Sequence, residues 1–381
     1  MNSHAANTGL NIMRLRSAIF LSAVLGTNSL LHAQSAKWSI DPTPIFSLGN
    51  STDESSAEFA IVTGATVLPD KNIMVGDRND YSMYIMSPAG KVLKKFGRNG
   101  PGPGEMVGAF FTYRCGKEIF VIEGNGNISA FNTDGTFIRR FRFGMGVSKG
   151  EPYRSACNQN AMFVHNGWPK DVPPTAGKPN RSPVPVWVSA GDSSSGHMIA
   201  TVKGAERFEY GSMPLGHDTR LALGNDRVYV AEGETYEIKV FTLDGKPLPS
   251  ITKSVKPVAV TKQDITDDID RLLQMVGPSV AKKMRKQVEA NYEAAPLPKV
   301  LPPYRELLVD IDQNLWVRDY AISGTTNVIW TVFDRTGKQL TELALPNTLE
   351  VFEIGKDYVL GRYIEANADL PEVRMYQLNR R

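Results

Sequence analysis

Short runs in which hydrophobic and polar residues alternate recur along most of the chain, and turns that end in glycine separate them. The runs are rich in Val, Ile, Tyr, Phe and Trp, which favour β-strands. Asp-Gly, Asn-Gly and Ala-Gly occur in the turns, where glycine supplies the positive φ that tight hairpins need. The pattern predicts an antiparallel meander. Four stretches share this layout: LPDKNIMVGDRNDYSMYIMSPAGKVLKKF, RCGKEIFVIEGNGNISAFNTDGTFIRRF, LGNDRVYVAEGETYEIKVFTLDGKPL and DIDQNLWVRDYAISGTTNVIWTVFDRTGKQL.

The spacing of these units is that of a propeller blade. Gly90 and Gly135 end equivalent turns and lie 45 residues apart, close to the roughly 40 to 45 residues of a four-stranded blade. Two weaker copies fit the same template, CNQNAMFVHNGW with VPVWVSAGDSSSGHMIATV, and EIGKDYVLGRY with EVRMYQL. The sequence therefore predicts an all-β fold, a six-bladed β-propeller over residues 37–381. A large β-sandwich is the alternative.

The sixth unit has only three strands before the chain ends. The segment KWSIDPTPIFSL, residues 37–48, is a strand without a unit of its own. An unpaired strand edge is a liability for a folded protein. We therefore expect this N-terminal strand to complete the sixth blade.

The first 33 residues have the layout of a secretory signal peptide. Arg14 and Arg16 precede the apolar run AIFLSAVLG, and Ala33 stands at a suitable cleavage position, with Met13 as an alternative start. Its removal takes away two arginines and no acidic residue, so the net charge falls from +3 to +1. Such a balance argues against a nucleic-acid partner. No later run approaches the roughly 20 apolar residues of a membrane span. We expect a periplasmic or secreted protein.

The chain resembles a family of bacterial exported proteins. The resemblance rests on the signal peptide, the glycine-turn units, FGRNGPGPGEM after the first unit, and LPPYRELLVDIDQNLWV opening the fifth. These features are similar to those of exported six-bladed β-propellers related to NHL-repeat propellers. The resemblance covers essentially the whole mature chain and implies the fold. Most of that family is functionally uncharacterised, so it implies little chemistry.

Three irregular segments are expected on one face of the propeller. They are FGRNGPGPGEM, the proline-rich residues 167–183, and a helical insertion at residues 261–296 between blades four and five. In the insertion, Thr261 and nearby acids are typical of a helix start, and Ile265, Ile269 and Leu273 lie on one helix face. Loops on a rigid scaffold commonly carry function. We therefore place a binding site on this loop-and-helix face, with a purely structural cap as the alternative.

An acidic ring is the main candidate for chemistry. Aligned second strands place six polar residues at one equivalent position, and converging carboxylates among them would suit Ca²⁺, which prefers several oxygen ligands. The alternative is that each acid hydrogen-bonds the amides of a nearby turn. The ligand-binding candidates are Asp77, Glu123, Asn166, Glu232, Asp319 and Arg362, and the metal candidates among them are Asp77, Glu123, Glu232 and Asp319.

Other motifs favour structural roles. FGRNGPGPGEM lacks the spacing of a phosphate-binding loop, and Pro101 and Pro103 have no backbone N–H to donate. Cys115 and Cys157 fall at equivalent places in adjacent units, so we expect a disulfide between them. His165, His197 and His217 show no zinc-motif spacing.

Two functions remain open. The first is a non-catalytic binding or scaffold module that grips a protein, glycan or small-molecule ligand through the loop-and-helix face. The alternative is a metal-dependent propeller hydrolase or lyase, similar to lactonases, that holds its ion in the acidic ring. No catalytic residue is assigned, and Ca²⁺ is the cofactor that the second function would use.

Overall fold

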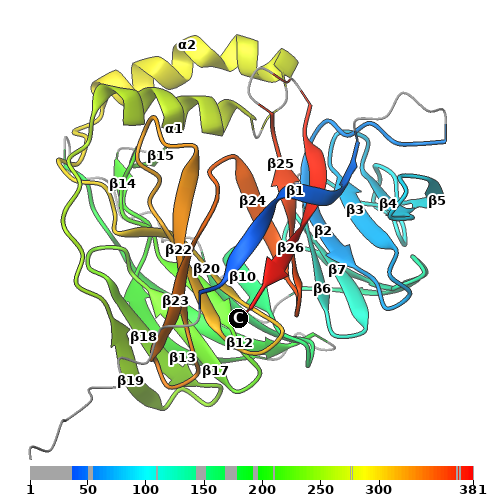
Figure 1. The fold of residues 1–381 in the computed structure, drawn as a ribbon, viewed down its shortest axis with the longest axis horizontal. Helices are drawn as coiled ribbons and strands as arrows, with labels where there is room; N and C mark the ends of the chain where they lie inside the picture. The colour runs from blue at the N-terminus through cyan, green and yellow to red at the C-terminus, as the bar shows by residue number, and fades with distance from the viewer. Residues whose placement is uncertain are drawn as a thin grey trace, which may run out of the picture. The chain divides into compact units, whose positions relative to one another are not determined.

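Six antiparallel four-stranded sheets make up the protein in the computed structural model (Figure 1). The structure describes residues 37–380 except 50–54, 109, 143–151, 168–177, 192–195, 209–210, 275, 277, 366–367 and 369. The predicted signal peptide therefore lies outside the described residues, as does most of the proline-rich segment. Within the described part, no helix is long and apolar enough to cross a membrane.

The first three sheets follow one another along the chain. Blade one contains β2 (Val62–Val67), β3 (Ile73–Asp77), β4 (Ser82–Met86) and β5 (Val92–Phe96). Blade two contains β6 (Phe110–Cys115), β7 (Glu118–Glu123), β8 (Ile128–Asn132) and β9 (Phe137–Phe141). Blade three contains β10 (Pro152–Cys157), β11 (Met162–Gly167), β12 (Pro183–Ala190) and β13 (Gly196–Lys203). In each sheet the order in space is the order in sequence.

Blades four and five repeat this order, with extra elements in the connections before them. The short pair β14 (Arg207–Phe208) and β15 (Gly211–Ser212) comes before blade four. Blade four contains β16 (Arg220–Leu223), β17 (Arg227–Ala231), β18 (Glu237–Thr242) and β19 (Pro247–Thr252). Helices α1 (Lys262–Gln274) and α2 (Pro278–Ala294) come next. Blade five contains β20 (Tyr304–Val309), β21 (Leu315–Asp319), β22 (Asn327–Phe333) and β23 (Gln339–Pro346).

The sixth blade joins the two ends of the chain. It contains β24 (Leu349–Ile354), β25 (Tyr358–Tyr363), β26 (Glu372–Asn379) and β1 (Ser39–Leu48). Strand β1 pairs antiparallel with β26, from Ser39 opposite Asn379 to Leu48 opposite Val373. The prediction that the N-terminal strand completes this blade is confirmed. The pairing covers an edge of β26 that would otherwise be open.

Apolar side chains pack between neighbouring blades. Phe59 and Tyr84 of blade one, for example, belong to the same buried cluster as Leu360 of blade six. Gly135 ends its turn with φ of 80°, and a Cβ there would lie 2.6 Å from the Phe96 ring of the preceding blade. Glycine is thus required both for the turn and for the close approach of two blades.

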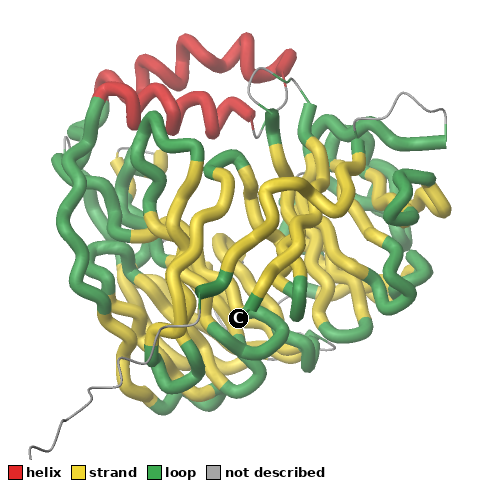
Figure 2. Tube along the Cα trace, viewed as in Figure 1, coloured by secondary structure: helices red, strands yellow, loops and turns green. Residues whose placement is uncertain are grey.

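The helical pair lies beyond one end of the strands (Figures 1 and 2). Thr261 begins α1 with a reciprocal cap, because its backbone N–H donates to Asp264 Oδ2 over 2.8 Å while its hydroxyl accepts from the Asp264 N–H over 3.2 Å. Ile269 and Leu273 of α1 are buried against Tyr292 of α2. The two helices therefore support each other above this end of the propeller.

Candidate functional site

A cavity of about 910 Å³ lies where the first strands of the blades converge, and helices α1 and α2 contribute to its wall. First strands of adjacent blades contact each other, including β2 with β6 and β16 with β20. Residues from all six first strands line the cavity. Its size falls within the range of small-molecule sites, roughly 300 to 1,000 Å³.

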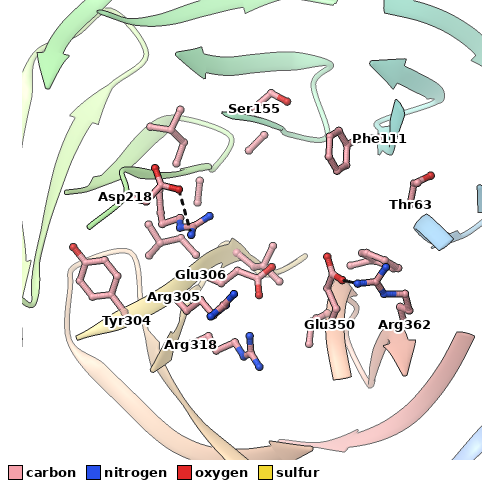
Figure 3. Close-up of a pocket in the computed structure, with 18 of the residues that line it drawn as sticks. Thr63, Phe111, Ser155, Asp218, Tyr304, Arg305, Glu306, Arg318, Glu350 and Arg362 are labelled. Carbon is pink, nitrogen blue, oxygen red and sulfur yellow. Dashed lines mark hydrogen bonds and ion pairs between the residues drawn. The ribbon is translucent and has the colours of Figure 1, made fainter. Parts of the chain in front are cut away.

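The two sides of the cavity differ in character (Figure 3). Blades one to three contribute the uncharged Thr63, Phe111 and Ser155. Phe111 is 48% exposed although its ring faces this enclosed space. The charged residue of these blades in the lining is Arg114, which lies 3.6 Å from Glu353 of blade six. Most of the charged side chains belong to blades four to six, and this side of the cavity is called the ionic wall.

Two ion pairs form the flanks of the ionic wall. Arg220 of β16 lies 3.3 Å from Asp218, measured from Nη2 to Oδ2. Arg362 of β25 forms a hydrogen-bonded ion pair with Glu350, its cross-strand neighbour on β24. Arg362 Nη1 also donates to the Val62 carbonyl of blade one over 3.2 Å. In each flank the charge of the arginine is therefore cancelled by the charge of its acidic partner.

Blade five supplies the centre of the ionic wall. A bulge at Arg305 interrupts the pairing of β20 with β21. A bulge of this kind re-aims neighbouring side chains, and both Arg305 and Glu306 line the cavity. Glu306 lies opposite Arg318 across the two strands, as Glu350 lies opposite Arg362 in blade six. Unlike Glu350, Glu306 accepts no hydrogen bond from the residues that the structure describes.

Burial dominates the protonation of Glu306. It raises the pKa of the Glu306 carboxyl to about 7, although Arg318 acts in the opposite direction. Arg318 is 9% exposed and donates through Nη2 to the Asn347 carbonyl over 2.9 Å. Its Nε is buried and has no hydrogen-bond partner within the described part of the chain. The site therefore holds a largely buried arginine opposite a carboxyl that is partly protonated near neutral pH.

Asp268 connects the helical pair to this wall. Its carboxylate accepts a hydrogen bond from Arg271 over 2.5 Å and one from the Tyr292 hydroxyl over 2.6 Å. It also lies 3.7 Å from Arg305 Nη1, whose guanidinium lies over the Tyr320 ring. Burial favours the protonated acid, but Arg271 and Arg305 outweigh it and lower the pKa of Asp268. Asp268 thus joins the helices to blade five, and so does Asp264 of α1, which accepts from the Ser323 hydroxyl over 2.6 Å.

A histidine–glutamate pair also lines the cavity. His217 Nδ1 lies 2.8 Å from Glu206 Oε2, and the His217 backbone N–H donates to the same oxygen. Burial opposes ionisation of Glu206, but the hydrogen bonds from His217 lower its pKa. The sequence alone assigned His217 no role. The missed signal is its position in the connection that leads into a first strand.

Of the six residues predicted from the second strands, only Arg362 lines the cavity. Asp77 accepts from the backbone amides of Ala60 and Ile61 over 2.9 and 3.0 Å. Glu123 accepts from the Val107 amide over 3.0 Å, and Glu232 from the Lys203 amide over 2.8 Å. Asp77 and Glu123 bind amides that precede a first strand, and Glu232 binds the amide of the last residue of β13, so all three accept from backbone amides as the structural alternative expected.

The other two predicted residues also lie outside the cavity lining. Asn166 is 1% exposed. Asp319 is half-buried, and burial raises its pKa to about 6. Among the described residues, no group of three or more His, Cys, Asp and Glu side chains is placed to hold a metal ion. The first strands of the blades line the cavity, and of the six predicted residues only Arg362 is part of that lining.

The remaining motifs have structural partners. Cys115 and Cys157 form a disulfide with a Cα–Cα distance of 5.7 Å, joining blades two and three. In the glycine-rich loop, Glu105 accepts from the Gly102 amide over 2.8 Å and pairs with Arg98. That loop is therefore a turn that its own glutamate stabilises, as the sequence indicated.

The comparisons with known proteins concern the fold. No protein-family model matches the chain, and no curated protein matches it. A DUF4221 family member from Bacteroides vulgatus aligns with a TM-score of 0.51 at 10% identity, over 91% of this chain and 100% of that chain. This chain is a six-bladed β-propeller. At such an identity the likeness shows the fold of the propeller and nothing of its ligand.

Two further solved structures align with the propeller. A Bacteroides fragilis protein described as exported has a TM-score of 0.46 at 12% identity, with 91% of this chain and 96% of that chain covered. Virginiamycin B lyase from Staphylococcus aureus has a TM-score of 0.41 at 9% identity, with 91% and 95% covered.

Proposed function

We propose that the protein is an exported binding module, periplasmic or secreted, that holds a small anionic ligand in the central cavity beneath α1 and α2. The observation that carries this proposal is the convergence of charged side chains from three blades on a cavity of about 910 Å³. The predicted helical insertion and loop-bearing face would then form the entrance to the site.

The charge arrangement supports an anionic ligand. Arg220 and Arg362 are neutralised by acids of their own blades, and Asp268 is shared between Arg271 and Arg305. Arg318 faces only Glu306 across the strands. Because Glu306 is partly protonated near neutral pH, the centre of the wall carries a surplus of positive charge. An anion would satisfy it, and guanidinium groups suit carboxylates and phosphates.

An enzyme of the hydrolase or lyase type is the second candidate. Glu306 favours it, because a carboxyl with a pKa near 7 suits general acid–base catalysis. The His217–Glu206 pair on the same cavity is a further candidate base. A metal-dependent form would still need the carboxylates of the predicted ring, and those of Asp77, Glu123 and Glu232 bind amides outside the cavity. Native mass spectrometry before and after EDTA tests for a bound divalent ion.

Cavity filling tests the binding function. The mature protein would be titrated calorimetrically with panels of small organic anions, amines and neutral sugars. We expect the best anion to bind wild type, to lose at least tenfold affinity in the Thr63→Trp or Ser155→Trp variant, and to bind normally to Thr201→Trp. Thr201 is exposed on the outer strand β13 and serves as the matched control. An anion that binds equally to folded cavity-filled variants, or a preference for amines, would refute the proposal.

A further inference from the structure

We propose that the ligand of the cavity is an acidic saccharide, a short sugar that carries a ring carboxylate. This inference rests on the proposed function of the cavity as a ligand site and adds the chemical class of the ligand. Three features of the cavity support it: a pair of arginines, the carboxyl of Glu306, and an exposed aromatic ring across from them.

The arginines of blade five match a carboxylate. Arg305 and Arg318 both line the cavity, on adjacent strands of one blade. Arg318 is 9% exposed, and its buried Nε lacks a partner among the described residues. A guanidinium presents its N–H groups as a rigid fork that fits a carboxylate. A ligand carboxylate beside these two arginines would pair with guanidinium groups that line the cavity.

The acids of the same wall match hydroxyl groups. Glu306 lines the cavity opposite Arg318 and accepts no hydrogen bond within the described part of the chain. Its carboxyl oxygens are therefore open to a donor from a ligand, and a hydroxyl is a suitable one. A sugar brings several such hydroxyls beside its carboxylate. A simple aromatic acid brings none, so it would leave Glu306 unsatisfied.

The opposite wall matches the apolar face of a sugar ring. Phe111 is 48% exposed and points into the cavity from blade two (Figure 3). Exposed aromatic side chains inside a pocket offer large, rigid apolar area to a ligand. Thr63 and Ser155 beside it present hydroxyls to the same space. An acidic sugar would therefore contact charged side chains on one side and the Phe111 ring on the other. A cavity of about 910 Å³ has room for two or three sugar units.

Calorimetry with matched sugars tests this class. The probes are di- and trigalacturonate, their methyl esters, cellobiose and benzoate, each titrated into the mature wild-type protein. We expect the free acids to bind at least tenfold more tightly than the esters, which keep the ring and lose the charge. We also expect Phe111→Ala to weaken the acid at least fivefold. The control Ile138→Ala changes an exposed side chain on β9, outside the cavity, and leaves binding unchanged.

The outcomes separate the ligand class from the site. Equal binding of acids and esters, or tighter binding of benzoate than of either galacturonate, overturns the saccharide class. If other anions still bind and the cavity-filling variants still block them, the proposed function survives that result. Absence of heat with every galacturonate at 10 mM also overturns the class. If Phe111→Ala does not weaken binding of the acid, the sugar ring does not pack on Phe111, and the inference is refuted.

Discussion

Replacement of Glu306 by glutamine tests the electrostatics of the cavity directly. Burial raises the pKa of Glu306 to about 7 in the folded state, from the ordinary value of 4.5. Each pKa unit corresponds to about 1.4 kcal/mol, so ionised Glu306 destabilises the folded state by about 3.5 kcal/mol at most. Because the Glu306 side chain is only partly buried, solvent screens its charge and we expect about 2 kcal/mol.

The sign of this effect follows from proton binding. Below pH 4.5 the carboxyl is protonated in both the folded and the unfolded chain, so it has no effect on stability. Between pH 4.5 and 7 the folded chain binds more protons, and its free energy of unfolding falls as the pH rises. The cost is complete above pH 7. Glu306→Gln removes it, so the variant should gain stability relative to wild type as the pH increases.

Urea unfolding of both proteins at pH 5 and pH 8 measures this difference. About a quarter of the effect is already present at pH 5, so we expect the free energy of unfolding of Glu306→Gln, relative to wild type, to rise by about 1.5 kcal/mol between the two pH values. Asp319, whose raised pKa of about 6 acts in the same range, is present in both proteins and cancels. Parallel pH dependence of the two proteins would refute the view that Glu306 is held in a desolvated, partly protonated state.

Three further predictions concern the framework. Deletion of residues 37–48 should lower the melting temperature by more than 10 °C in scanning calorimetry, because it exposes the edge of β26; an unchanged melting curve would contradict closure by β1. Cys115→Ser should lower the free energy of unfolding in urea by about 4 kcal/mol, since the disulfide spans 42 residues; dithiothreitol should then lower the stability of wild type but not of the variant. Asp268→Asn should speed hydrogen exchange in α1 and α2 at least tenfold and leave exchange in blade two unchanged; equal exchange rates in variant and wild type would show that Asp268 does not hold the helices in place.

The fold was largely predictable because it repeats. Gly90 and Gly135 mark equivalent turns, and their spacing alone predicts the length of one blade. The sixth unit lacked one strand and the N-terminal strand had no unit, so the sequence predicted that the two would pair. The pairing of β1 with β26 confirms this. Each of these predictions rests on hydrogen bonding that the backbone must satisfy regardless of side-chain detail.

The cavity was harder to predict because it depends on which strand faces the axis. An acid at the end of a second strand is conspicuous in sequence, yet Asp77 turns toward the amides of Ala60 and Ile61. A usable signal was present elsewhere. Glu306 and Arg318 recur at the spacing of Glu350 and Arg362, each glutamate on a first strand and each arginine opposite it on the second. Alignment of the first strands would have brought out this repeat.

Closure by β1 also determines the order in which the molecule can assemble. Ser39 pairs with Asn379, 340 positions later in the chain, so this contact carries a large loop-closure entropy and belongs to the end of folding. Until then the earlier blades form from local hairpins while β26 presents an open edge. A β1 segment from a second molecule fits that edge equally well. The fold thus contains a kinetic choice between ring closure and domain exchange, and protein concentration during refolding decides between them.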